Sequence, residues 1–143
     1  MSNLPSINQP DFDLNLPQYP LEVKTGEAQE VVFDKIRKKY VVLTPEEWVR
    51  QHFVNYLIYD LKYPKSLIKI ESGLVVNNLG KRTDIVVYNQ AIKPFLVVEC
   101  KASRVPLNDK AMEQLAIYNR TLKAKYLVLT NGLKHYCCSM DYD

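Results

Sequence analysis

Glycine is scarce in this chain: four glycines occur in 143 residues, at positions 26, 73, 80 and 132, and none are close together. The chain therefore lacks the Gly-x-x-x-x-Gly-Lys-Ser/Thr loop that cradles nucleotide phosphates, and we expect no nucleotide cofactor. It also lacks an apolar run near the roughly 20 residues that span a bilayer, so we expect no membrane partner. Without a Gly-x-Ser-x-Gly elbow, acyl-transfer catalysis has no support.

Cysteine is also infrequent, and Cys100, Cys137 and Cys138 form an odd set without a framework spacing. The amino terminus has no basic region followed by an apolar stretch. Together these two features favour the reducing cytoplasm. Cys137 and Cys138 make a poor zinc half-site, because no second pair and no suitably spaced histidines accompany them. We interpret them as a structural thiol pair.

Charge is unevenly distributed along the chain. The net charge is +3, but residues 1–30 carry one lysine and five acids, whereas residues 31–143 carry 18 basic and 11 acidic side chains. A basic body behind an acidic leader is compatible with a polyanionic ligand, although many plain enzymes share it. The densest positive patch, Arg37 to Lys39, is more often a solvated face than a phosphate site.

The length suits one domain. Four of the eight prolines lie within residues 1–23, among scattered Asn, Asp and Gln. We expect a proline-rich arm over residues 1–29, either extended or docked, and a folded domain over residues 30–143. The chain is a stand-alone domain or a fragment of a longer protein.

The hydrophobic pattern predicts two helices among several strands. Thr44 to Glu47 begins the first helix, because Thr44 can cap it, Pro45 suits the first position and Glu47 completes a capping box. This helix is expected to end before Tyr63-Pro64. The other expected elements are two short strands within 30–43, strands at 68–76 and 83–88 joined by a turn at 77–80, a strand at 94–101, a helix at 108–123, and strands at 126–130 and 134–139. This order predicts the α/β or α+β class, with a mixed central β-sheet flanked by helices.

Charged residues mark the end of the most apolar strand. Period-two geometry places Glu99 and Lys101 on one strand face, and Asp84 opens the preceding strand. A hairpin connection would bring the two strands side by side, so that Asp84 and Glu99 converge at one end of the sheet. Two carboxylates close together repel each other, which costs free energy unless a cation compensates their charge. We therefore predict a Mg²⁺ site formed by Asp84, Glu99 and the backbone carbonyl of Cys100. Lys101 would orient the attacking water or stabilise negative charge; the alternative is a simple ion pair at a strand end.

These residues also resemble a known signature. Asp84, followed after 14 residues by Glu99-Cys100-Lys101, is similar to the signature of the PD-(D/E)XK nuclease superfamily, although Thr83 stands where that signature has proline. Gln114-Leu-Ala-Ile-Tyr118 is similar to the Gln-x-x-x-Tyr element of RecB-like nucleases. Residues 44–138 resemble the amino-terminal nuclease domain of type I restriction enzyme R subunits. The matching pieces are Pro-Glu-Glu-Trp-Val-Arg-Gln at 45–51, Arg-Thr-Asp-Ile-Val-Val-Tyr at 82–88, Val-Glu-Cys-Lys-Ala at 98–102 and Tyr-Leu-Val-Leu-Thr-Asn-Gly at 126–132.

The resemblance implies a restriction-endonuclease-like fold and a Mg²⁺-dependent phosphodiesterase that acts on DNA, with Mn²⁺ as a substitute metal. It adds Gln114 and Tyr118 to the site, four residues apart and hence on one helix face. It also adds Glu47, for which the capping box is an equal interpretation. Type I R subunits couple this domain to an ATP-driven motor, and the motor's phosphate loop is absent here.

Several basic residues could hold phosphates, Arg82 foremost because it lies two residues before Asp84. The full set is Arg50, Lys65, Arg82, Arg104 and Lys110. Two other functions stay open: a DNA-binding module of the same fold that acts with a motor or specificity subunit, and a structural domain in which the charges form a surface network. A homodimer would fit a nuclease that cuts two strands, and nothing in the sequence indicates base-specific recognition.

Overall fold

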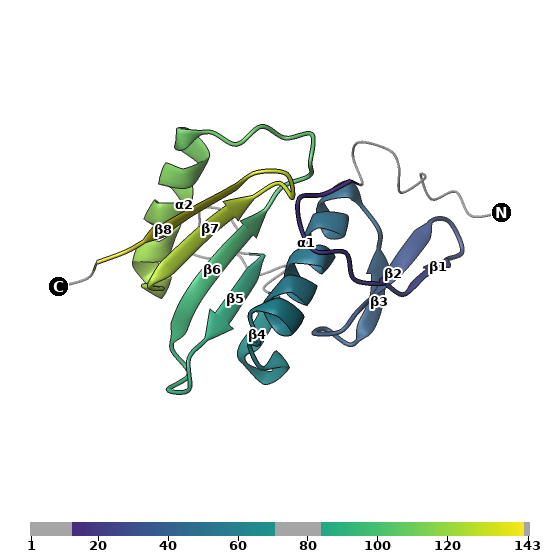
Figure 1. The fold of residues 1–143 in the computed structure, drawn as a ribbon, viewed down its shortest axis with the longest axis horizontal. Helices are drawn as coiled ribbons and strands as arrows, with labels where there is room; N and C mark the ends of the chain where they lie inside the picture. Colours follow the sequence, from purple (N-terminus) through teal and green to yellow (C-terminus); the bar gives the residue numbers. More distant parts are fainter. Residues whose placement is uncertain (1–12, 71–83, 142–143) are drawn as a thin grey trace.

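The computed structural model describes residues 13–70 and 84–141, which form two sheets and two principal helices (Figure 1). The smaller sheet contains β1 (Val23–Thr25), β2 (Glu30–Asp34) and β3 (Lys39–Val42), paired antiparallel in that order. β2 and β3 confirm the two short strands predicted within residues 30–43. β1 was not predicted, and it pairs a segment of the expected proline-rich arm with β2.

The larger, central sheet has the strand order β4-β5-β6-β7-β8. β6 and β7 are parallel and the other neighbours are antiparallel, so the sheet is mixed, which confirms the predicted fold class. The strands are β4 (Ile68–Ile70), β5 (Ile85–Tyr88), β6 (Pro94–Cys100), β7 (Tyr126–Thr130) and β8 (His135–Ser139). The turn predicted at residues 77–80 lies outside the described residues.

The two helices cover opposite faces of the central sheet, and α1 also separates it from the smaller sheet (Figure 1). The side chains of β6 alternate between the two faces: Val98 packs with residues of α1, and Val97 packs with residues of α2. α2 (Asp109–Leu122) also makes the crossover that parallel β6 and β7 require. Asn108 caps its first turn, as the pattern predicted, by accepting from the backbone N–H of Ala111.

α1 (Pro45–Asn55) begins at the predicted cap, where Thr44 Oγ1 accepts from the backbone N–H of Glu47 at 3.0 Å. The helix continues as the π-helical turn η2 (Tyr56–Asp60), in which the N–H of Leu61 donates to the carbonyl of Tyr56. The prediction of one continuous helix up to Tyr63 is thus correct in extent, but its last turn is wider than an α-helix. A 3₁₀ turn, η3 (Lys65–Leu67), then leads into β4.

The described part of the arm is docked on the domain. The backbone N–H of Asn15 donates to the carbonyl of Gly132 at 2.7 Å, and His135 Nε2 donates to the carbonyl of Asn15 at 2.9 Å. Leu14 and Leu16 pack against the core beneath α1. Gly132 has a φ of +84°, and a Cβ there would lie 2.7 Å from a methyl carbon of Leu14. Close approach of the arm therefore requires glycine at this position.

We predict that Gly132→Ala lowers the free energy of unfolding by about 2 kcal/mol, because it adds both a left-handed non-glycine residue and a clash with Leu14. Urea denaturation measures the effect. In the control, Leu14→Ala removes the clash but not the backbone strain, so the double variant should lose less stability than the sum of the two single variants. Strict additivity would contradict the docked position of the arm.

Candidate active site

Two carboxylates lie at one end of the central sheet, where β5 begins and β6 ends. Ile85 pairs with Val98 in the antiparallel ladder, and continuing this register by one residue places Asp84 opposite Glu99. Directly opposite residues of an antiparallel pair share one face of the sheet, about 4.5–5.5 Å apart at Cβ. The backbone thus brings together the two carboxylates that the sequence singled out.

Asp84 is held from both sides. Its Oδ2 accepts from the backbone N–H of Cys100 at 2.5 Å, and its Oδ1 lies 2.6 Å from Nη2 of Arg50. One bond fixes the carboxylate to β6 and the other to α1. Its side chain is 14% exposed, so solvent reaches it from one direction only.

Lys101 lies two residues after Glu99, directly after the end of β6. Its Nζ lies 3.9 Å from Glu99 Oε2, and its side chain is 36% exposed against 12% for Glu99. Its backbone N–H donates to the carbonyl of Thr130 at 2.8 Å, which ties this position to β7. A pair this long and this open to solvent contributes little to stability, on the order of 0–1 kcal/mol. The backbone of Lys101 is therefore fixed to β7, while its ammonium group stays accessible to a ligand.

Arg50 is the positive centre of the site, and its side chain is only 8% exposed. Besides Asp84, it contacts Glu47 Oε1 through Nη1 at 2.8 Å and Glu46 Oε2 through Nη2 at 2.9 Å. Burial alone lowers the pKa of Arg50, but Asp84 and Glu47 together outweigh burial and raise it, so the side chain stays charged. Its Nε is buried and has no hydrogen-bond partner within the described residues.

Arg50 was expected to bind DNA phosphates. The structure instead places its guanidinium among three carboxylates of the protein, and a contact with DNA stays a prediction. The sequence did contain a signal for this ion pairing: Glu46 and Glu47 precede Arg50 by four and three residues, so all three lie on neighbouring positions of one helix.

Glu47 extends the network away from Asp84. Its carboxylate also accepts from Arg37 Nη2 at 3.0 Å and from Gln51 Nε2 at 3.1 Å. The second half of the predicted capping box is not formed, because the backbone N–H of Thr44 donates to the carbonyl of Val42. Glu47 is buried, and its carboxylate contributes to the charge network rather than to the helix cap.

Asp34, at the end of β2, completes this network and was missed in the sequence. It is fully buried, and it accepts from Arg37 Nε at 2.7 Å and from Gln51 Nε2 at 2.9 Å. The backbone N–H groups of Ile36 and Arg37 also donate to its Oδ1, which closes the turn between β2 and β3. A continuous chain of charged contacts therefore runs from this turn through α1 to Asp84. Asp34 stands before a basic turn, and this is a local signal for the turn itself. Its contact with Gln51 on α1 could be found only from the folded structure.

Gln114 and Tyr118 lie on α2, which covers the sheet face that also carries Glu99 and Lys101, by alternation from Val97. Tyr118 is buried and Gln114 is exposed. A role for Gln114 and Tyr118 at the site stays a prediction. Arg104 is exposed in the loop that follows β6, and Arg82 lies outside the described residues.

The three cysteines differ in their burial. Cys100 is buried, and burial followed by the charge of Asp84 raises the pKa of its thiol well above the usual value. Its thiol therefore stays protonated, and only its backbone takes part in the site. Cys137 and Cys138 are both free, on β8.

The donors at the sheet end have the chemistry that Mg²⁺ prefers. The two carboxylates, Asp84 and Glu99, and the carbonyl of Cys100 are hard oxygen ligands, and Mg²⁺ usually keeps several waters. Within residues 13–70 and 84–141, no three His, Cys, Asp or Glu side chains are grouped as for a metal ion. The predicted Mg²⁺ site therefore stays a prediction, and a metal there would have to share Asp84 with Arg50.

Comparison with known families shows which family the chain belongs to. Residues 45–143 match the family described as the type I restriction enzyme R protein N terminus. The match includes α1, the central sheet and every residue at the sheet end. A search of curated proteins found no match. Within the part of the chain that the structure describes, no helix is long and apolar enough to cross a membrane.

We predict that Arg50→Met lowers the free energy of unfolding by about 3–5 kcal/mol, because it leaves buried Glu47 without its cation from α1. Chemical denaturation of the full chain measures this loss. Glu47→Gln is the matched second variant, since it removes the charge that Arg50→Met leaves uncompensated. The Arg50→Met/Glu47→Gln double variant should be more stable than Arg50→Met alone, and a further loss would contradict the network described above.

Proposed function

Because the chain belongs to the family of the type I restriction enzyme R protein N terminus, we propose that it is a divalent-metal-dependent nuclease that hydrolyses phosphodiester bonds of DNA. The observation that carries this proposal is the register of β5 and β6, which pairs Ile85 with Val98, the neighbours of Asp84 and Glu99. The proposal is supported by the hydrogen bond from the N–H of Cys100 to Asp84 and by the proximity of Lys101 to Glu99, which bring three groups useful for phosphodiester hydrolysis to one end of the sheet.

Asp84 and Glu99 would hold the metal, together with the carbonyl of Cys100. A bound Mg²⁺ or Mn²⁺ would supply Lewis-acid stabilisation of charge on the phosphate and a lower pKa for water. The protein contributes a fixed position for Asp84, because the N–H of Cys100 and the guanidinium of Arg50 hold its two oxygens. Preorganised groups of this kind lower the cost of reaching the transition state.

Lys101 would orient the attacking water and stabilise negative charge as the bond to phosphorus forms. Its backbone is fixed to β7, while its side chain is accessible enough to meet a ligand. Gln114 and Tyr118 would contact the substrate backbone or the waters around the metal, from the helix that covers this face. Glu47 would act indirectly, because it forms a salt bridge with Arg50, and Arg50 forms a salt bridge with Asp84.

A second function is favoured by one specific observation. Both oxygens of Asp84 already have partners, and the charge of Arg50 compensates it without any metal. This arrangement suits a DNA-binding module that keeps the fold of a nuclease and acts with a motor or specificity subunit. In either case we propose that the chain works on DNA alongside another subunit or as a homodimer, in the cytoplasm.

We predict that Lys101→Ala lowers the rate of Mg²⁺- or Mn²⁺-dependent cleavage of plasmid and linear DNA by about 100-fold or more, as expected for loss of a group that assists proton transfer. Lys93→Ala is the matched control, because Lys93 is exposed in the turn between β5 and β6, at the opposite end of these strands. The control should cleave at the wild-type rate.

Equal activity in the Lys101 variant and the wild type, or cleavage that persists in EDTA, would contradict the proposed catalytic role. Binding of DNA without cleavage under any divalent metal would select the second function instead.

A further inference from the structure

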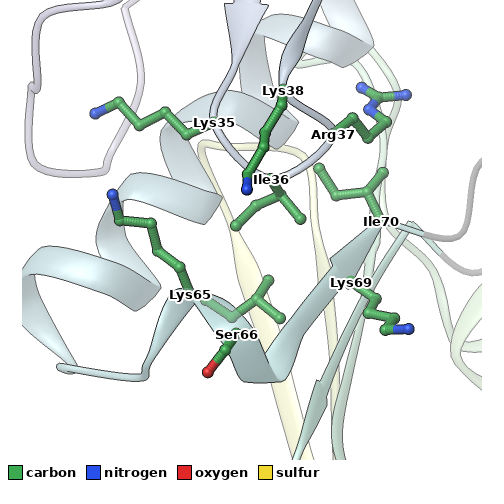
Figure 2. Close-up of a pocket in the computed structure, with 9 residues that line it drawn as sticks. Lys35, Ile36, Arg37, Lys38, Lys65, Ser66, Lys69 and Ile70 are labelled. Carbon is green, nitrogen blue, oxygen red and sulfur yellow. The ribbon is translucent and has the colours of Figure 1, made fainter.

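A basic pocket lies between the β2–β3 turn, η3 and β4 (Figure 2). Its volume is about 620 Å³. Five of its nine lining residues are Lys or Arg, and none is acidic. We define the basic pocket by Lys35, Ile36, Arg37, Lys38, Lys65, Ser66, Ile68, Lys69 and Ile70.

None of its four lysines forms a salt bridge with a described residue, and Lys38 and Lys65 are the two that we consider first. Lys38 reaches into the hollow from the β2–β3 turn, and Lys65 reaches towards it from η3 (Figure 2). Neither forms a salt bridge with any described residue, whereas Arg37 is neutralised by Asp34 and Glu47. Like charges gathered without a counter-charge raise the energy of the free protein, and an anion bound between them would relieve this repulsion.

Lys35 adds a third positive charge to the pocket. Both hydrogen bonds of its ammonium group go to neutral side chains. Its Nζ donates to Tyr59 Oη at 2.9 Å and to Asn55 Oδ1 at 3.4 Å. The hydrogen bond from Lys35 lowers the pKa of Tyr59, and the charges of Lys35 and Lys65 act in the same direction. Lys35 and Lys65 are thus close enough to act on one phenol, which makes the pocket a local concentration of positive charge.

The apolar part of the pocket lining consists of Ile36, Ile68 and Ile70. A small inorganic anion would gain nothing from contact with these isoleucines. A nucleic-acid strand matches both parts, because its phosphates would lie against the lysines and its sugars against the isoleucines. The pocket therefore fits a polymer of phosphodiesters better than a free phosphate.

Two sets of contacts link the pocket to Asp84. Ile70 in its lining pairs with Ile85, the residue directly after Asp84. Arg37 in its lining contacts Glu47, which shares Arg50 with Asp84. A nucleic-acid strand bound in the pocket would therefore lie on the side of the domain from which α1 and β4 reach Asp84.

We propose that the basic pocket binds the sugar–phosphate backbone of DNA, a few nucleotides from the phosphate held at Asp84 and Glu99. This inference rests on the proposed function for the direction of the strand, but the affinity of the pocket for DNA does not depend on cleavage. Lys38 and Lys65 make the phosphate contacts, and Lys35 adds to the field.

The test is fluorescence anisotropy of a labelled DNA duplex with the full chain, in EDTA, at several salt concentrations. The pocket variant is Lys38→Gln/Lys65→Gln; glutamine keeps a long side chain at Lys38, whose φ is +58°. The control is Lys93→Gln/Lys125→Gln, which removes the same charge from two exposed positions that do not line the pocket. Thermal unfolding of both variants checks that the fold is kept.

We expect the pocket variant to lose affinity at least tenfold at low salt, and the slope of log affinity against log salt to fall by about 1.8, since each lost phosphate contact contributes roughly 0.9. The control should stay close to wild type. Equal losses in the two variants, no loss in either, or no binding by wild type would overturn the assignment. An unlabelled RNA that displaces the duplex better than DNA, compared at equal phosphate concentration, would also overturn it.

Failure of this inference and failure of the proposed function give different results. If wild type binds DNA through the pocket but never cleaves it, the pocket stands and the nuclease proposal fails. If wild type cleaves DNA and the pocket variant binds and cleaves like the control, the nuclease proposal stands and the pocket is excluded.

Discussion

The contact between Arg50 and Asp84 links the parts of this structure that matter for function. Arg50 extends from α1, which packs on one face of the central sheet, and Asp84 stands at the entrance to β5. The same guanidinium holds Glu47, and through Glu47 and Arg37 it reaches the β2–β3 turn of the smaller sheet. A buried charge network of this kind is costly to break, because each remaining charge would be left without its partner. This network therefore fixes the positions of α1, the smaller sheet and Asp84 relative to one another.

This constraint explains why the site lies where it does. β6 is the middle strand of the central sheet, and its apolar residues continue to Val98 before the charged side chains of Glu99 and Lys101 follow near its end. α1 packs on one face of the sheet and brings Arg50, whereas α2 covers the face that carries Glu99 and Lys101. The basic pocket, which we propose as a DNA contact, is linked to this end of the sheet by the pairing of Ile70 with Ile85.

Much of this architecture is encoded locally and could be predicted. The cap at Thr44, the two short strands within residues 30–43 and the helix predicted over residues 108–123 depend on short-range signals, and the structure confirms each of them. The antiparallel pairing of β5 with β6 was also accessible, because a short connection favours a hairpin. The role of Arg50 and the buried position of Asp34 could not be predicted. Arg50 contacts a residue 34 positions away in the chain, and Asp34 contacts a residue 17 positions away. β1 was missed because three residues carry no readable period.

The central claim is that Asp84 and Glu99 form a metal site at the sheet end. Calorimetric titration of Mn²⁺ into the purified chain, wild type beside the Asp84→Asn/Glu99→Gln variant, tests this claim without needing the correct DNA. A matched Asp109→Asn/Glu113→Gln variant, with both changes on exposed positions of α2, controls for lost charge. We predict binding by wild type and by the control, and loss of binding in the Asp84→Asn/Glu99→Gln variant. Equal binding by all three proteins, or no binding by wild type with or without DNA, would contradict the account.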